Sequence, residues 1–219
     1  AHLIAQDPSL KTPYETVFGS LPDLSDTARF PLAARPMLDT NHPEHLAWDD
    51  MSEADQHTIN IIFSNAGKAI AAFEQTLVRS ESPFDQFITA FKAGELDAIP
   101  NYGVSEYRGL QLFVGRANCI LCHSGPMFSD LQFHNLGLTP TAWMDPTDRG
   151  RYDGIPIVED DPFNGVGLYS DDPEAGQIKV GFIALDAEKL GQFKTPSLRN
   201  IALTPPYMHG GQLPTLEDV

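Results

Sequence analysis

Hydrophobic residues recur every three or four positions between residues 59 and 77, which is the spacing of one face of an α-helix. The members of this face are Ile59, Ile62, Phe63, Ala66, Ile70, Phe73 and Leu77. The segment Ser52–Asp55 reads Ser-Glu-Ala-Asp, a capping-box pattern that predicts the start of the helix. Ser80–Pro83 predicts its end. The chain is therefore expected to contain a long amphipathic helix of roughly seven turns.

Two shorter helices are predicted after it. The first carries Phe84, Phe87, Ile88 and Phe91 on one face and is stopped by Gly94. The second starts at Ser105, continues to Val114 and leads into the segment that contains the first cysteine, Cys119.

Beyond residue 123 the pattern becomes irregular. Ser124–Thr139 predicts a compact loop, and Thr141–Gly181, with repeated Asp-Pro and Gly, predicts a long turn-rich loop of functional or mobile character. Ile178–Leu185 gives a weak strand signal, and Lys194–Ile201 predicts a turn leading to a short helix with proline near its first turn. The sequence therefore predicts a mainly α fold with long irregular loops.

The strongest chemical signal is Cys119-Ile120-Leu121-Cys122-His123, a C-x-x-C-H attachment sequence for c-type haem. Two thiols about one helical turn apart can add to the two vinyl groups of one porphyrin. The adjacent His123 can then ligate the iron as its proximal ligand. Both cysteines of the chain are in this motif, so none remains for a structural disulfide. We therefore expect one covalent haem c, in a cytochrome c-like domain.

Two other interpretations of the cysteines are weaker. A zinc site would need a fourth ligand at metal-like spacing, and the chain has no second cysteine pair. A thioredoxin-like C-x-x-C would follow a buried strand, whereas Leu110–Arg116 reads as the end of a helix.

Bulk composition narrows the range of partners. The chain has 219 residues, a hydrophobic content of 42% and a formal net charge of −16. This charge makes nucleic acid and anionic membrane surfaces poor partners, so neither is expected. No apolar run approaches the roughly 20 residues of a membrane span. Covalent haem c is made outside the bacterial cytoplasm, so the motif predicts a periplasmic protein.

The negative charge is concentrated between residues 141 and 190. Eleven acidic residues face only four basic ones there. A solvated loop is one interpretation. The other is an electrostatic docking surface for a basic electron-transfer partner, or a cation site.

Several segments together resemble the bacterial di-haem cytochrome c peroxidase family, including its MauG-like branch. The segments are Ala69–Leu77, Ser82–Asp85, Gly109–Phe113, Cys119–Gly125, Phe133–Asn135 and Phe193–Gly211. The last one, with Lys-Thr-Pro-Ser-Leu-Arg-Asn and Tyr-Met-His-Gly-Gly, is long and specific. The acidic segment between 141 and 190 is the least similar part.

The resemblance implies two haem domains. Residues 1–100 would be the helical remainder of the N-terminal domain and a linker, and residues 101–219 the C-terminal haem c domain. The peroxide-reactive second haem c would lie upstream of residue 1. The distal ligand of the haem on His123, Met in peroxidases and Tyr in the MauG-like branch, would lie beyond Val219. A capping-box pattern at Thr215–Asp218 agrees with a helix that continues past the end of this sequence.

The resemblance also implies roles for individual residues. Cys119 and Cys122 would be the thioether residues, and the carbonyls of Thr204 and Pro206 would contribute to a calcium site between the haems. Arg199 is a candidate for a haem propionate, since a guanidinium binds a carboxylate through two hydrogen bonds.

Residue type adds further candidates. Phe128 and Phe133 are expected along the haem face. Met208 is a candidate sixth ligand by residue type alone. No catalytic residue is assigned within the chain.

Three functions follow from these observations. The first is the electron-transferring haem part of a di-haem peroxidase that reduces hydrogen peroxide, with a small periplasmic cytochrome c or cupredoxin as donor. The second is a MauG-like enzyme that oxidises Trp or Tyr of a partner protein. The third is a mono-haem electron carrier without catalysis. A homodimer is a candidate assembly, because dimers are common in the peroxidase branch.

Overall fold

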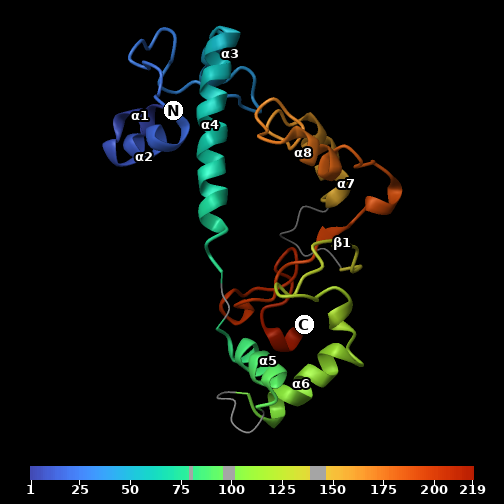
Figure 1. The fold of residues 1–219 in the computed structure, drawn as a ribbon. Helices are drawn as coiled ribbons and strands as arrows, with labels where there is room; N and C mark the ends of the chain where they lie inside the picture. Colours follow the sequence, from blue (N-terminus) through green and yellow to red (C-terminus); the bar gives the residue numbers. More distant parts are fainter. Residues whose placement is uncertain (79–80, 96–101, 139–146) are drawn as a thin grey trace. The chain divides into compact units, whose positions relative to one another are not determined.

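A computed structural model describes residues 1–78, 81–95, 102–138 and 147–219. The chain forms two compact units, of which the first comprises Ala1–Leu77 with Pro162–Pro173 and the second comprises Val78–Asp161 with Glu174–Val219. Helices dominate both units (Figure 1), which confirms the mainly α fold. The division into residues 1–100 and 101–219 refers to the two haem domains that the family resemblance implies, and it stays a prediction.

The first unit contains the helices α1 (His2–Gln6), α2 (Pro8–Phe18), α3 (Pro43–Asp49) and α4 (Glu53–Glu74). Its core consists of the buried side chains Leu24, Phe30, Trp48, Met51 and Ile62. The segment 162–173 packs on α4, where the rings of Phe163 and Phe63 lie 5.1 Å apart and Lys68 forms a 2.6 Å ion pair with Asp171.

The second unit contains α5 (Pro83–Ala93), α6 (Val104–Val114), α7 (Arg151–Asp160) and nearly all of α8 (Pro173–Val180). Among the described residues of this unit, short 3₁₀ turns accompany them: η1 (Cys119–Leu121), η2 (Ala187–Lys189), η3 (Ile201–Leu203) and η4 (Leu216–Asp218). Strands β1 (Phe133–His134) and β2 (Phe193–Lys194) pair antiparallel, with Phe133 opposite Lys194. This pairing brings the segment after the cysteines against residues 193–199.

The predicted helices before residue 115 are confirmed. The hydroxyl of Ser52 accepts the backbone N–H of Asp55 at 3.2 Å and opens α4, which ends at Glu74, three residues before Leu77. Ser82 and Asp85 form a complete capping box at the start of α5, and Gly94 ends that helix in the left-handed conformation with φ +75°. The capping box at Thr215 and Asp218 is also present.

Two predictions for the region after residue 140 are wrong. The segment Thr141–Gly181 is not one irregular loop, because its described part from residue 147 contains α7 and α8. The strand predicted at Ile178–Leu185 is absent, since its first residues belong to α8.

Long-range contacts explain why α7 forms despite an internal Pro156. Ile155 is buried, and the backbone N–H of Arg151 donates to the carbonyl of Gln192 at 2.8 Å. Tertiary packing here overrides weak local propensity.

The segment Lys194–Ile201 differs in part from its prediction. It begins in β2, continues through residues 195–198 without regular structure, and reaches a turn at residues 199–200 and a 3₁₀ turn at Ile201. Pro196 therefore lies in the irregular stretch and not at the start of a helix. No helix in the described part of the chain is both long and apolar enough to cross a membrane.

Candidate functional site

The C-x-x-C-H residues form a single tight turn, separated from α6 by residues 115–118. The backbone N–H groups of Cys122 and His123 both donate to the carbonyl of Cys119, at 3.3 and 2.8 Å. Both cysteines are half-buried free thiols. The two thiols and the imidazole are therefore carried by one rigid turn, the arrangement needed to hold a porphyrin at two vinyl positions and at its iron.

The imidazole of His123 is held in one tautomer. Its Nδ1 lies 2.9 Å from the carbonyl oxygen of Phe128. A carbonyl can only accept, so Nδ1 carries a proton, and in the neutral imidazole Nε2 then presents a lone pair. This is the usual arrangement of a metal-binding histidine, whose second nitrogen donates to a backbone carbonyl. The residues present thus fit a haem c.

A compact loop, Ser124–Asp130, carries that carbonyl. The N–H of Ser129 donates to the carbonyl of Ser124 at 2.9 Å, and the N–H of Asp130 donates back to the carbonyl of Cys122 at 2.8 Å. Phe128 has φ +51°, a left-handed conformation that is uncommon outside glycine. The surrounding hydrogen bonds hold this conformation and aim the Phe128 carbonyl at the histidine.

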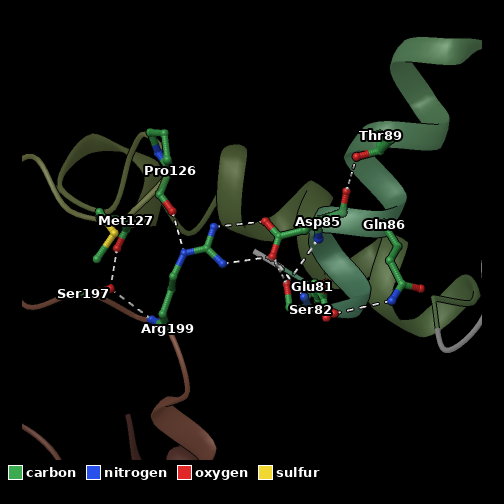
Figure 2. Close-up of polar contacts among 9 residues, drawn as sticks. All are labelled: Glu81, Ser82, Asp85, Gln86, Thr89, Pro126, Met127, Ser197 and Arg199. Carbon is green, nitrogen blue, oxygen red and sulfur yellow. Dashed lines mark hydrogen bonds and ion pairs between the residues drawn. The ribbon is translucent and has the colours of Figure 1, made fainter. Parts of the chain in front are cut away.

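Arg199 links this loop to α5. Its Nη1 and Nη2 donate to the two carboxylate oxygens of Asp85 at 2.9 and 3.0 Å, and its Nε donates to the carbonyl of Pro126 at 2.7 Å (Figure 2). The hydroxyl of Ser197 donates to the next carbonyl, that of Met127, at 2.7 Å. The guanidinium also lies over the Phe128 ring at 5.5 Å.

The pair is well shielded from solvent, with side-chain exposures of 15% for Arg199 and 20% for Asp85. The guanidinium, followed by the hydroxyl of Ser82, holds the pKa of Asp85 well below its usual range. The same hydrogen bonding to Asp85 raises the pKa of Arg199. Both groups are therefore charged at neutral pH.

An open cavity of about 670 Å³ lies beside the loop, a size within the range of ligand pockets. Phe84, Phe113, Phe128, Leu198 and Arg199 are among its lining residues. The side chains of Cys119, Cys122 and His123 are not among the described residues that line it.

The remaining predicted site residues lie elsewhere in the second unit. Phe133 is on β1, where the guanidinium of Arg151 lies 4.7 Å from its ring centre. Thr204 and Pro206 flank Pro205 after η3. Their carbonyls accept no hydrogen bond from any residue in the described ranges.

The structure also brings together residues that the sequence analysis did not assign. His134 Nε2 lies 2.7 Å from a carboxylate oxygen of Asp130, and ligand atoms of Cys122, Asp130 and His134 lie within 4.8 Å of one another. The backbone N–H of Gln132 and then His134 lower the pKa of Asp130 to about 2. A Cys122 thiol joined to haem would leave this set with two ligands.

The local sequence around Asp85 indicates only part of its role. The Ser-x-x-Asp spacing of Ser82 and Asp85 predicts the capping box, but not the ion pair, because Arg199 lies 114 residues away.

Comparisons with known proteins agree on one group of relatives, although no family model matches the chain. The cytochrome-c peroxidase IdrP1 of Denitromonas iodatirespirans is 33% identical over 169 residues, covering 71% of this chain and 39% of that protein. The methylamine utilization protein MauG of Methylorubrum extorquens is 34% identical over 151 residues, covering 69% of this chain and 32% of MauG. Cytochrome c551 peroxidase of Nitrosomonas europaea is 30% identical over 164 residues, covering 75% of this chain and 37% of that protein.

This chain therefore spans 32% to 39% of the length of these relatives. A solved structure of a MauG-like protein associated with microbial copper homeostasis shares 27% sequence identity, with a TM-score of 0.44. The match covers 76% of this chain and 41% of that one.

Proposed function

Since this chain belongs to the family of di-haem cytochrome c peroxidases and MauG-like proteins, we propose that it is the electron-transferring haem part of a periplasmic peroxidase. In this proposal a small external donor supplies the electrons, and two electrons and two protons reduce one hydrogen peroxide to two waters. The supporting observation is the turn that presents two free thiols and the Nε2 lone pair of His123 together.

In this proposal each residue of the motif has a separate role. Cys119 and Cys122 would form the two thioethers, and His123 would ligate the iron through Nε2. A bound haem c would supply one-electron redox chemistry at this position. The Phe128 carbonyl would keep the Nδ1 proton in place and increase the basicity of the imidazole.

Phe128 and Phe133 are proposed to line the haem face. Contact between Arg199 and a haem propionate also remains a proposal. In the structure three N–H groups of this guanidinium bind Asp85 and Pro126, which leaves two of its five donors.

Calcium is proposed as a second, structural cofactor. The carbonyls of Thr204 and Pro206 would provide two oxygens, and Ca²⁺ takes six to eight. The remaining ligands would come from water and from another segment of the protein.

The charge of the chain supports a basic electron donor. With a net charge of −16, the protein attracts a cationic cytochrome or cupredoxin by long-range electrostatics. The same charge predicts that the association rate falls as ionic strength rises.

A MauG-like activity is the second candidate, because MauG of Methylorubrum extorquens is as similar to this chain as the peroxidases are. The substrate would then be a Trp or Tyr of a partner protein. The distal ligand of the haem on His123 separates the two activities: Met favours the peroxidase and Tyr favours the MauG-like enzyme. A mono-haem carrier, the third candidate, would exchange electrons but leave peroxide unchanged in any context.

The experiment mixes the haem-loaded protein with a reduced small cytochrome c and hydrogen peroxide, and follows donor oxidation. We expect this haem segment alone to take electrons from the donor without consuming peroxide, and to support turnover when joined to an N-terminal haem segment of the family. Turnover by this segment alone would assign peroxide chemistry to the haem on Cys119 and Cys122. Failure to accept electrons from the donor would refute the proposal.

A further inference from the structure

We propose that Asp85 and Arg199 are positioning residues for the haem ligand His123, acting through the backbone of the loop Ser124–Asp130. This inference rests on the proposed function, since it assumes that His123 ligates a haem iron. It adds to that function a pair of residues, distant in sequence, that controls the haem potential.

The argument starts from three consecutive carbonyl groups. Those of Pro126 and Met127 accept hydrogen bonds from Arg199 Nε and the Ser197 hydroxyl, each at 2.7 Å. The third carbonyl, that of Phe128, accepts from His123 Nδ1 at 2.9 Å. The segment Ser197–Arg199 therefore holds the two peptide units directly before the one that orients the histidine.

Asp85 fixes Arg199 in turn. Figure 2 shows the guanidinium between the Asp85 carboxylate on α5 and the Pro126 carbonyl on the loop. The carboxylate is itself held by the hydroxyl and the backbone N–H of Ser82, at 2.7 and 3.0 Å, as part of the capping box of α5. Charge-assisted hydrogen bonds with two contact points define geometry more tightly than single ones.

The backbone at Phe128 needs such support. A left-handed φ of +51° is costly for a bulky residue and persists only where neighbouring contacts impose it. The guanidinium over its ring, at 5.5 Å, adds a cation–π contact to the same residue. Loss of the pair would let Phe128 move toward ordinary backbone angles and turn its carbonyl away from His123.

The consequence for the haem follows from ligand basicity. A strong hydrogen bond from Nδ1 makes the imidazole a better donor to iron and favours the oxidised state. Weakening that bond is therefore expected to raise the midpoint potential of the haem.

The experiment measures the midpoint potential of the haem-loaded protein by spectroelectrochemistry for Asp85→Asn, Arg199→Lys and Ser197→Ala. Arg199→Lys keeps the positive charge but loses the two-point fork, so it separates positioning from simple electrostatics. Glu44→Gln is the matched control, because it removes the partner of an exposed arginine, Arg35, in the other unit.

We expect an upward shift for all three variants, largest for Asp85→Asn, and none for Glu44→Gln. Unchanged potentials in Arg199→Lys and Ser197→Ala would overturn the inference, whether or not Asp85→Asn folds. Failure of the proposed function gives a different result: the wild type would carry no covalent haem, or would carry one with shifted potentials in the variants but without electron uptake from the donor.

Discussion

His123 Nδ1 and the carbonyl oxygen of Phe128 lie 2.9 Å apart, five residues along the chain, and this one hydrogen bond determines which imidazole nitrogen is available to a metal. The carbonyl has no proton to give, so Nδ1 carries one, and in the neutral imidazole the lone pair is on Nε2. Because the Asp85–Arg199 pair holds the same loop, the local haem motif depends on residues far away in the sequence.

The first prediction concerns covalent attachment. Replacing Cys119 and Cys122 together by alanine removes both sulfurs that could form thioethers, so we expect no haem to remain on the denatured chain. Haem staining after denaturing electrophoresis and intact mass measure this directly. The wild type should carry one haem and one iron per chain. Stoichiometric zinc and no haem in the wild type would instead favour a metal set of Cys122, Asp130 and His134.

The second prediction concerns the pH dependence of stability. The pKa of an unfolded aspartate is about 3.9, whereas the folded pKa of Asp85 is lower because Arg199 and Ser82 bind the carboxylate. The ionised carboxylate therefore stabilises the fold fully above about pH 4, and this contribution is lost as the pH falls through the folded value.

We expect Asp85→Asn to lower the free energy of unfolding by about 2 kcal/mol at neutral pH, less than for a fully buried pair, because both side chains retain some exposure. Urea unfolding followed by circular dichroism at about pH 7 and at about pH 3 measures the difference. The gap between variant and wild type should shrink at the lower pH. An equal gap at both values would show that the carboxylate charge is not the cause.

How much the sequence could predict depended on how local each feature is. The starts of α4 and α5 follow from Ser52 and Ser82, which bind N–H groups three residues away. The C-x-x-C-H turn likewise follows from five consecutive residues. In these cases the contacts that determine the structure lie within the motif itself, so the sequence pattern is enough to predict them.

Features that depend on distant partners could not be predicted in this way. The helix α7 contains Gly154 and Pro156, which argue against a helix in the sequence. The contacts that stabilise it, the burial of Ile155 and the hydrogen bond from the Arg151 N–H to the Gln192 carbonyl, are known only from the fold. The role of Asp85 was hidden for the same reason, because its partner lies at the other end of the second unit in sequence. The nearby Ser82, three residues before Asp85, indicates only a helix cap.

The third prediction concerns the core of the first unit. Ile62 is 2% exposed among Leu24, Phe30, Trp48 and Met51. Truncation to alanine removes its packing and leaves a cavity, so we expect Ile62→Ala to cost about 3 kcal/mol in unfolding free energy. The control is Ile61→Ala on the same helix, which is 41% exposed and should cost less than about 1 kcal/mol. Chemical denaturation followed by circular dichroism compares the two, and equal losses would contradict the assigned core.

The last prediction concerns the contact between the loop Ser124–Asp130 and Thr195, which follows β2. The buried hydroxyl of Ser129 donates to the carbonyl of Thr195 at 2.7 Å and accepts the backbone N–H of Leu131 at 3.0 Å. Ser129→Ala would take the hydroxyl partner from both backbone groups, and the Thr195 carbonyl belongs to a buried residue, so we expect a loss of about 2 kcal/mol.

Thermal unfolding of the haem-loaded protein measures this loss, with the exposed Ser105 of α6 replaced by alanine as the control. The midpoint potential of the haem should stay unchanged in Ser129→Ala, because Phe128 and His123 keep their own hydrogen bond, and Arg199 and Ser197 still hold the Pro126 and Met127 carbonyls. A potential shift as large as that of Asp85→Asn would show that the loop is held mainly through Ser129, and would transfer the positioning role from Arg199 to the Ser129–Thr195 contact.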